Sequence, residues 1–314
     1  MAEETEKYDF SHLLPPSWKT TLEEWLHEDI PSFDIGGFVV GEKPEVAVLL
    51  GKADGMIAGC PFFEAVFEIM GCKVDWIKHD GDVLDLSSMG PKVPVAYVSG
   101  SCRHLLMGER TALNIIQRCS GVATIAHNAV ELAKKEKWHG MIAGTRKTTP
   151  GFRLVEKYGL IVAGAATHRE DLSQMVMLKD NHVVSAGGIT KAVKKAKRAT
   201  GFSCKVEVEC QSLEEAIEAA QAGAEVVMLD NFEPEKLKEA AAEVKRQFPF
   251  LTIEASGGIT METMPQFFSE HVDVISRGSL TYGYPCLDFS LKILPAGQTS
   301  FEASNGPASK KQKV

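Results

Sequence analysis

Cationic side chains stand at or just beyond the ends of three short apolar runs in the C-terminal two thirds of the chain. They are Arg146 and Lys147, His168 and Arg169, and Lys179. Arginine offers a carboxylate a planar pair of donors and lysine a compact point charge, so this combination suits a small ligand with several negative charges. The 34 basic and 42 acidic residues give the chain a net charge of −8. A local excess of cations in a negatively charged chain indicates a small, highly negative substrate.

Acidic side chains follow the next two runs. Lys205, Glu207 and Glu209 alternate along the chain, which places them on one face of a strand, and Asp230 ends the following run. Glu209 and Asp230 could bind Mg²⁺ for a polyphosphate, directly or through water, or act as a carboxylate pair in acid–base catalysis. Lys205 and Glu207 are expected to form a supporting charge network, because charges that face a packed interior must be paired.

Two glycine-containing turns end the last two runs. Ser256, Gly257 and Gly258 join a strand to a helix, and Gly278 lies in a similar turn on the next strand. Such turns expose backbone N–H groups to an anion, and a tandem of them on late strands is the usual phosphate site of phosphate-binding barrels. The sequence therefore combines a phosphate site, an acidic metal site and a cationic cluster.

The ends of these apolar runs can meet at one edge of a sheet only if the runs are parallel strands that alternate with helices. Seven apolar runs after Gly140 read as strands: Met141–Thr145, Leu160–Ala163, Met175–Leu178, Val206–Val208, Val226–Leu229, Thr252–Ala255 and Val272–Ser276. Helical patterns separate the later runs at Ile189–Ala199, Leu213–Ala222, Glu235–Gln247 and Met261–Phe268. This alternation predicts an incomplete seven-stranded barrel of the TIM kind, whose active site would lie at the C-terminal ends of the strands.

The N-terminal region reads as a scaffold of mixed α and β structure. It contains three expected strands and two short expected helices: Glu45–Leu50, Lys73–Ile77, Val93–Val98, Trp25–Asp29 after a capping box at Thr21–Glu24, and Phe62–Met70. A long helix is predicted from Gly108 to Lys137, and it is apolar on most of its sides. Arg110, Asn114 and Arg118 form a polar stripe on it, so we expect this helix to lie between domains or subunits.

Composition narrows the class of protein. A chain of 314 residues with 44% hydrophobic and 24% charged residues is long enough for about two globular domains. Its negative charge argues against nucleic-acid binding, and apolar runs short of about 18 residues argue against a membrane span. Seven scattered cysteines and an acidic N-terminus without a secretory pattern favour the cytoplasm. The Lys-rich residues 299–314 read as a disordered tail that only weakly resembles a nuclear signal.

Eight motifs in order make the chain resemble the quinolinate phosphoribosyltransferase (decarboxylating) family, from about Leu13 to Leu294. The motifs are Gly108–Asn114, Cys119–Gly121, Gly144–Gly151, His168–Arg169, Leu178–His182, Val206–Glu209, Leu229–Asn231 and Glu254–Gly258. The segments His12–Pro16 and Glu28–Asp34 resemble the eukaryotic branch and, within it, the fungal members.

The resemblance implies an α/β fold of the type II phosphoribosyltransferases. An open-sandwich domain over residues 1–119, completed by 284–298, would precede an incomplete seven-stranded α/β barrel over 120–283. It also implies homo-oligomers built from two-fold dimers, either a dimer or a hexamer.

The resemblance also implies the reaction and its residues. Quinolinate and phosphoribosyl pyrophosphate (PRPP) would give nicotinate mononucleotide, pyrophosphate and CO₂, for NAD synthesis. Quinolinate would be bound by Arg146, Lys147, His168, Arg169 and Lys179, with Arg110 from the neighbouring subunit. Glu209 and Asp230 would serve PRPP and Mg²⁺, and Ser256, Gly257, Gly258 and Gly278 the phosphates.

Three other functions remain as alternatives. A phosphoribosyltransferase for nicotinate is less favoured, because one carboxylate needs fewer cations. An aldolase that uses Lys179 as a Schiff-base nucleophile would be trapped by borohydride with a carbonyl substrate. A non-catalytic sensor would fail a turnover assay.

Overall fold

The computed structural model describes residues 8–295, 298 and 300–301. The chain divides into two compact units, Met1–Ser120 with Cys286–Val314, and Gly121–Pro285, and the division falls inside the helix α5 (Cys102–Lys135). The boundaries expected from the sequence, at 119/120 and 283/284, lie close to these positions. The expected disordered tail falls outside the described residues, apart from residues 300 and 301.

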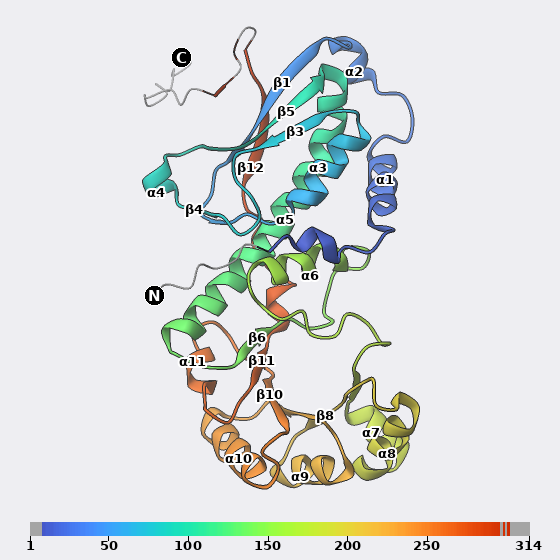
Figure 1. Cartoon of the computed structure of the whole chain (residues 1–314), viewed down its shortest axis with the longest axis vertical. Coiled ribbons are helices and arrows are strands. Elements are labelled where there is room, and N and C mark those ends of the chain that lie inside the picture. The colour runs from blue at the N-terminus through green and yellow to red at the C-terminus, as the bar shows by residue number, and fades with distance from the viewer. Residues whose placement is uncertain (1–7, 296–297, 299, 302–314) are drawn as a thin grey trace, which may run out of the picture. The chain divides into compact units, whose positions relative to one another are not determined.

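The first unit is built on a four-stranded antiparallel sheet (Figure 1). Its strand order is β12 (Phe289–Ile293), β1 (Pro44–Gly51), β5 (Val93–Ser101) and β3 (Lys73–Trp76). The helix α3 (Cys60–Ile69) packs on β3, and α1 (Trp18–Asp29) packs on α3. The smaller elements are η1 (Phe10–Leu13), α2 (Ile35–Val40), β2 (Gly55–Met56), β4 (Val83–Leu84) and α4 (Leu86–Met89). The C-terminal strand thus returns to complete the sheet of the N-terminal segment.

Two helix starts in this unit differ from the sequence expectation. The helix α1 begins at Trp18 after Ser17, so Thr21–Glu24 lies inside the helix and is not its capping box. The helix α5 begins at Cys102 rather than Gly108, directly after β5. Arg110, Asn114 and Arg118 are all exposed along α5, which shows the predicted stripe on one accessible face. Among the described residues, no helix is both long and apolar enough to cross a bilayer.

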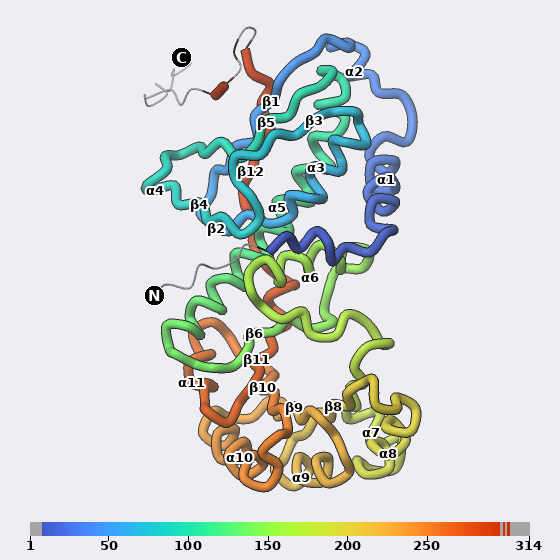
Figure 2. Tube along the Cα trace, viewed as in Figure 1, coloured from blue at the N-terminus to red at the C-terminus, as the bar shows by residue number. Residues whose placement is uncertain are grey.

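The second unit is a curved parallel sheet with helices on its outer side, and Figure 2 shows the strands following one another around it. The strand order is β6 (Met141–Ala143), β11 (Val274–Ser276), β10 (Thr252–Ser256), β9 (Val226–Asp230), β8 (Val206–Cys210) and β7 (Val176–Leu178). The helices are α6 (Arg153–Val162), α7 (Asp180–Ala186), α8 (Ile189–Thr200), α9 (Leu213–Ala222), α10 (Pro234–Gln247) and α11 (Met264–Phe267), with η2 (Gly278–Leu280). The α/β fold with an incomplete barrel is confirmed.

One of the seven predicted strands is wrong. Leu160–Ala163 belongs mostly to α6, where Leu160 is fully buried. A short apolar run has no period of its own, so it suits a buried helix turn as well as a strand. The place beside β6 is taken instead by Ala166, which forms a single parallel bridge with Ala143. The sheet therefore has six strands and one isolated bridge.

Local signals fix the helices behind the late strands. Ser212 accepts the backbone N–H of Glu215 and starts α9, which ends at Gly223 with φ of 102°. Pro234 opens α10 as predicted. The expected helix Met261–Phe268 is only the short α11, because the preceding residues continue the turn after β10.

Candidate active site

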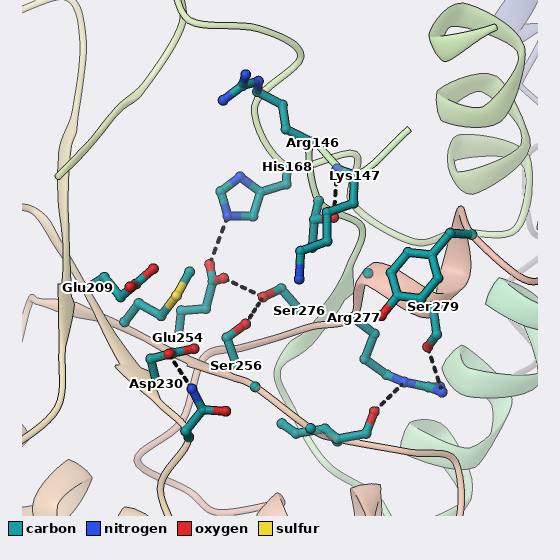
Figure 3. A pocket seen from close by; sticks show the side chains of 18 of the residues that line it. Arg146, Lys147, His168, Glu209, Asp230, Glu254, Ser256, Ser276, Arg277 and Ser279 are labelled. Carbon is teal, nitrogen blue, oxygen red and sulfur yellow. Dashed lines mark hydrogen bonds and ion pairs between the residues drawn. The ribbon is translucent and has the colours of Figure 1, made fainter. Parts of the chain in front are cut away.

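A cavity of about 850 Å³ opens at the C-terminal ends of the strands of the second unit. It brings together most of the residues singled out from the sequence, namely Arg146, Lys147, His168, Arg169, Lys179, Glu209, Asp230, Ser256, Gly257, Gly258 and Gly278. Figure 3 labels Arg146, Lys147, His168, Glu209, Asp230 and Ser256 among them. These side chains converge because the strands are parallel, so the C-terminal ends of all the strands lie at one edge of the sheet. Arg110 is exposed on α5 in the first unit and does not line this cavity.

The side of the cavity formed by the loop after β6 and the loop between α6 and β7 is cationic. Arg146 and Lys147 are exposed, and the hydroxyl of Thr281 donates to the carbonyl of Lys147 at 2.7 Å. Arg169 is buried, and its pKa is lowered first by burial and then by the positive charge of Arg146. Positive charges that repel one another in this way gain most when an anion binds between them.

His168 is held by protein groups on both ring nitrogens. The backbone N–H of Arg169 donates to Nδ1 at 2.7 Å, which leaves the proton of a neutral ring on Nε2. Nε2 lies 3.2 Å from Oε2 of Glu254 (Figure 3). The backbone of His168 has φ of 59°, a left-handed conformation that is strained for a residue with a side chain. The ring is therefore held in a fixed position in the wall of the cavity.

A buried acidic network lies beneath His168. Glu254 accepts a hydrogen bond of 2.5 Å from Ser276, whose hydroxyl is 3.1 Å from that of Ser256. Glu207 is fully buried, and burial and then the charge of Glu254 raise its pKa to about 9. The ligand-type atoms of His168, Glu207 and Glu254 lie within 4.8 Å of one another.

The predicted charge network of Lys205 and Glu207 is therefore wrong. Lys205 is exposed before β8 begins, whereas the partners of Glu207 are His168 and Glu254. Glu254 was not assigned a role from the sequence. The available signal was a lone carboxylate inside the apolar run Thr252–Ala255, which is costly unless it is paired.

Two carboxylates mark the ends of the adjacent strands β8 and β9. Lys179 donates to Oε2 of Glu209 at 2.7 Å, and Asn231 donates to Oδ2 of Asp230 at 2.5 Å. The pKa of Asp230 is raised first by burial and then by the negative charge of Glu209. The pair thus concentrates negative charge, and carboxylate oxygens are the ligands that Mg²⁺ prefers.

The turn after β10 exposes backbone rather than side chains. Gly257 and Gly258 have φ of 95° and 65°. A Cβ atom at Gly257 would lie 2.3 Å from Oδ1 of Asn231, so this position requires glycine. Arg277, to which the sequence assigned no definite role, fastens the turn, because its guanidinium donates to the carbonyl of Ile259 at 3.1 Å and to Ser279 at 3.2 Å.

Comparison with known families agrees with this combination of a glycine turn and a cationic wall. The family models "Quinolinate phosphoribosyl transferase, C-terminal domain" and "N-terminal domain" match residues 122–292 and 34–120. The chain belongs to the quinolinate phosphoribosyltransferase family. The cavity lies within the residues matched by the C-terminal domain of that family.

Relatives in this family cover almost the whole chain. A rat protein named nicotinate-nucleotide pyrophosphorylase (carboxylating) is 54% identical over 91% of this chain and 94% of its own length. A Dictyostelium discoideum protein of the same name is 48% identical over 91% of this chain and 99% of its own. These matches fit the predicted eukaryotic branch of the quinolinate phosphoribosyltransferases.

Solved structures share the fold. The nicotinate-nucleotide pyrophosphorylase from Francisella tularensis superposes with a TM-score of 0.81 at 32% identity, covering 90% of this chain and 98% of that one. The human nicotinic acid phosphoribosyltransferase, at 14% identity and a TM-score of 0.54, shares the fold alone.

Proposed function

We propose that this protein transfers the phosphoribosyl group of PRPP to quinolinate with decarboxylation. The products are nicotinate mononucleotide, pyrophosphate and CO₂, as required for de novo NAD synthesis. The observation that carries the proposal is one cavity that is lined both by the cations Arg146, Lys147 and Arg169 and by the glycine turn at Gly257. A dicarboxylate and a phosphorylated sugar can therefore be bound together.

Each of the two walls binds one part of the substrates. Arg146, Lys147 and Arg169 bind the adjacent carboxylates of quinolinate by charge and hydrogen bonds. The backbone N–H groups around Gly257 and Gly278 bind phosphate. Binding both substrates in one cavity makes the bimolecular reaction effectively unimolecular, and the fixed orientation of the substrates lowers the barrier.

The chemistry then needs charge stabilisation rather than a covalent enzyme intermediate. The bond from ribose C1 to the pyrophosphate oxygen breaks, its electron pair leaves with pyrophosphate, and C1 becomes cationic. The ring nitrogen of quinolinate donates its lone pair to C1 and becomes positively charged. The bond between the ring carbon and the adjacent carboxylate then breaks, CO₂ leaves, and the electron pair stays on the ring carbon, where the neighbouring positive nitrogen stabilises it until a proton adds to that carbon. Glu209 and Asp230 are the negative groups that can offset the developing positive charge.

We propose Glu209 and Asp230 as the residues that hold Mg²⁺, directly or through water. The donor chemistry fits, because both are carboxylates on adjacent strands and burial makes the charge of Asp230 costly without a cation. When bound, the ion neutralises the charge of the pyrophosphate group. Lys179 contacts Glu209 in the same place and supplies further positive charge.

We further propose that Arg110 acts on the active site of a neighbouring subunit. It is exposed on α5 beside Asn114 and Arg118, in a position open to another chain. A two-fold dimer or a hexamer of such dimers would let each subunit complete the site of the other.

The deciding experiment measures release of CO₂ and pyrophosphate from quinolinate and PRPP, with and without Mg²⁺. We expect equal amounts of both products, and a requirement for Mg²⁺. Turnover of nicotinate at a comparable rate, or no release of CO₂, would contradict the proposal. Borohydride inactivation with a carbonyl substrate would favour the aldolase alternative, although Lys179 is paired with Glu209 in the structure.

A cytoplasmic location is proposed as well. The cysteines 60, 72, 102, 119, 204, 210 and 286 are all free, as expected in a reducing compartment. Cell fractionation followed by immunoblotting would test this location, and enrichment in nuclei would contradict it.

A further inference from the structure

Two consecutive charged residues on α6 are almost completely buried. Glu156 is 0% exposed and Lys157 is 2% exposed. Neither of them lines the cavity. Buried charges are costly unless hydrogen bonds compensate for them, so the partners of these two residues indicate their role.

Glu156 fastens the loop that follows β6. Its Oε2 accepts the backbone N–H of Thr149 at 2.9 Å, and its Oε1 accepts the Thr149 hydroxyl at 2.8 Å. The hydroxyl of Tyr284 donates to the same Oε1 at 3.3 Å. Thr149 follows Arg146 and Lys147 closely in the chain, so Glu156 holds the loop that carries both of these cations.

Lys157 fastens the second cationic segment. Its ammonium group donates to the carbonyl of Thr167 and, at 3.3 Å, to the carbonyl of Arg169. These two carbonyls flank His168, the residue with strained left-handed backbone. One ammonium group thus holds both sides of the strained residue, and the conformation of the backbone there determines where Arg169 lies.

We propose that Glu156 and Lys157 are a pair of positioning residues that make the site selective for two adjacent carboxylates. Each holds one of the two loops that carry the cations, and both stand on one turn of the same helix. The separation of Arg146 and Arg169 is thereby set from a single rigid element. This inference rests on the proposed function for the identity of the ligand.

The charge of Lys157 offers an independent readout. Burial lowers its pKa to about 8, Glu170 opposes this change, and Arg153, Arg146 and Arg169 add to it. A bound dianion stabilises the charged form of Lys157, so binding above pH 8 takes up a proton there. Quinolinate affinity should therefore fall above pH 8 in the wild type.

The experiment measures quinolinate and nicotinate binding by calorimetry at pH 7 and pH 9, together with kcat and KM for PRPP. Lys157→Met removes the donor at similar length, and Glu156→Gln removes the charge at equal size. Lys194→Met, at an exposed position on α8, is the control. We expect Lys157→Met to lose at least tenfold in quinolinate affinity at pH 7, with less than threefold loss for nicotinate and for the KM of PRPP. The wild type should lose affinity between pH 7 and pH 9 more steeply than Lys157→Met.

Equal losses for quinolinate and nicotinate would overturn the proposal, because a merely structural role loosens the whole cavity. So would quinolinate affinity within threefold of the wild type. If Lys157→Met does not fold, Glu156→Gln decides by the same criteria at pH 7. A wild-type protein that binds no quinolinate would instead overturn the proposed function, which keeps the two failures distinct.

Discussion

The two walls of the cavity differ in the kind of group that they would present to an anion. One wall presents side-chain charge, with Arg146 and Lys147 on the loop after β6 and Arg169 on the loop between α6 and β7. The wall after β10 and β11 presents backbone N–H groups, with Gly257 and Gly258 after β10 in left-handed conformations and Arg277 behind them. Side-chain charge can be matched to the number and spacing of carboxylates, whereas bare backbone suits the generic geometry of phosphate. The comparison predicts that damage to one wall affects one substrate.

The largest effect is expected at the cationic wall. Arg146→Ala should lower kcat/KM for quinolinate by an amount equivalent to about 2–5 kcal/mol, because a carboxylate loses its partner inside the cavity. Steady-state kinetics with each substrate varied in turn will measure this effect. The exposed Lys194→Met serves as the control. A loss of less than about tenfold, equivalent to ~1.4 kcal/mol, would remove Arg146 from quinolinate binding.

A mixing experiment tests whether the cationic wall extends across subunits. Arg110→Ala and Lys179→Ala proteins should each be nearly inactive. After subunit exchange in a two-fold dimer, about a quarter of the sites should carry neither lesion and regain activity. Mass spectrometry verifies the exchange, and two Lys179→Ala preparations mixed together are the control. Activity that stays at the mutant level after verified exchange would show that Arg110 acts elsewhere.

The acidic pair should affect the phosphate substrate. Glu209→Ala and Asp230→Ala are each expected to raise the Mg²⁺ and PRPP concentrations needed for half-maximal rate by about tenfold or more. Quinolinate affinity without PRPP should change little, and calorimetry of that binary complex measures it. A large loss of quinolinate affinity would show that Glu209 and Asp230 act on quinolinate rather than on PRPP.

A smaller effect is expected from the backbone wall. Gly257→Ala combines a left-handed conformation with a contact of 2.3 Å to Asn231, whereas Gly223 has a similar conformation and open space around it. Gly223→Ala should cost about 1–2 kcal/mol of stability from strain alone. Gly257→Ala should cost more and should also raise the KM of PRPP. Urea unfolding and kinetics of both variants will show whether the turn is specific to phosphate.

The smallest effect is a slope of stability against pH. Because burial lowers the folded pKa of Lys157 to about 8, the folded state binds fewer protons than the unfolded state between pH 8 and the ordinary lysine value. The free energy of unfolding of the wild type should therefore rise relative to that of Lys157→Met across this window, by at most about 1.4 kcal/mol per pH unit. Parallel curves from urea titrations would show that Lys157 has an ordinary pKa.

Much of the site was predictable because strand ends in a parallel barrel converge. Polar residues that follow each apolar run, such as Glu209 near the end of β8 and Asp230 at the end of β9, could be assigned to one rim without coordinates. The starts of α9 and α10 were also predictable, because Ser212 and Pro234 are signals that act within one helical turn. The resemblance, carried by short motifs in order, identified the family before the fold was known.

Other features could be decided only by the tertiary structure. The run Leu160–Ala163 lies mostly in the helix α6, where Leu160 and Ala163 are buried as they would be in a strand, so burial alone did not distinguish the two structures. Glu207 interacts with Glu254 and His168 rather than with Lys205. Which side chains meet inside a barrel depends on which strands become neighbours, and the sequence does not give that order. Glu156 and Lys157 were assigned no role from the sequence, because their contacts with two loops arise only where α6 packs against those loops. Sequence by itself determined the kinds of groups and their order, because local spacing encodes strand ends and turns. Tertiary structure decided which charges were paired, because burial and distance arise only when the segments meet.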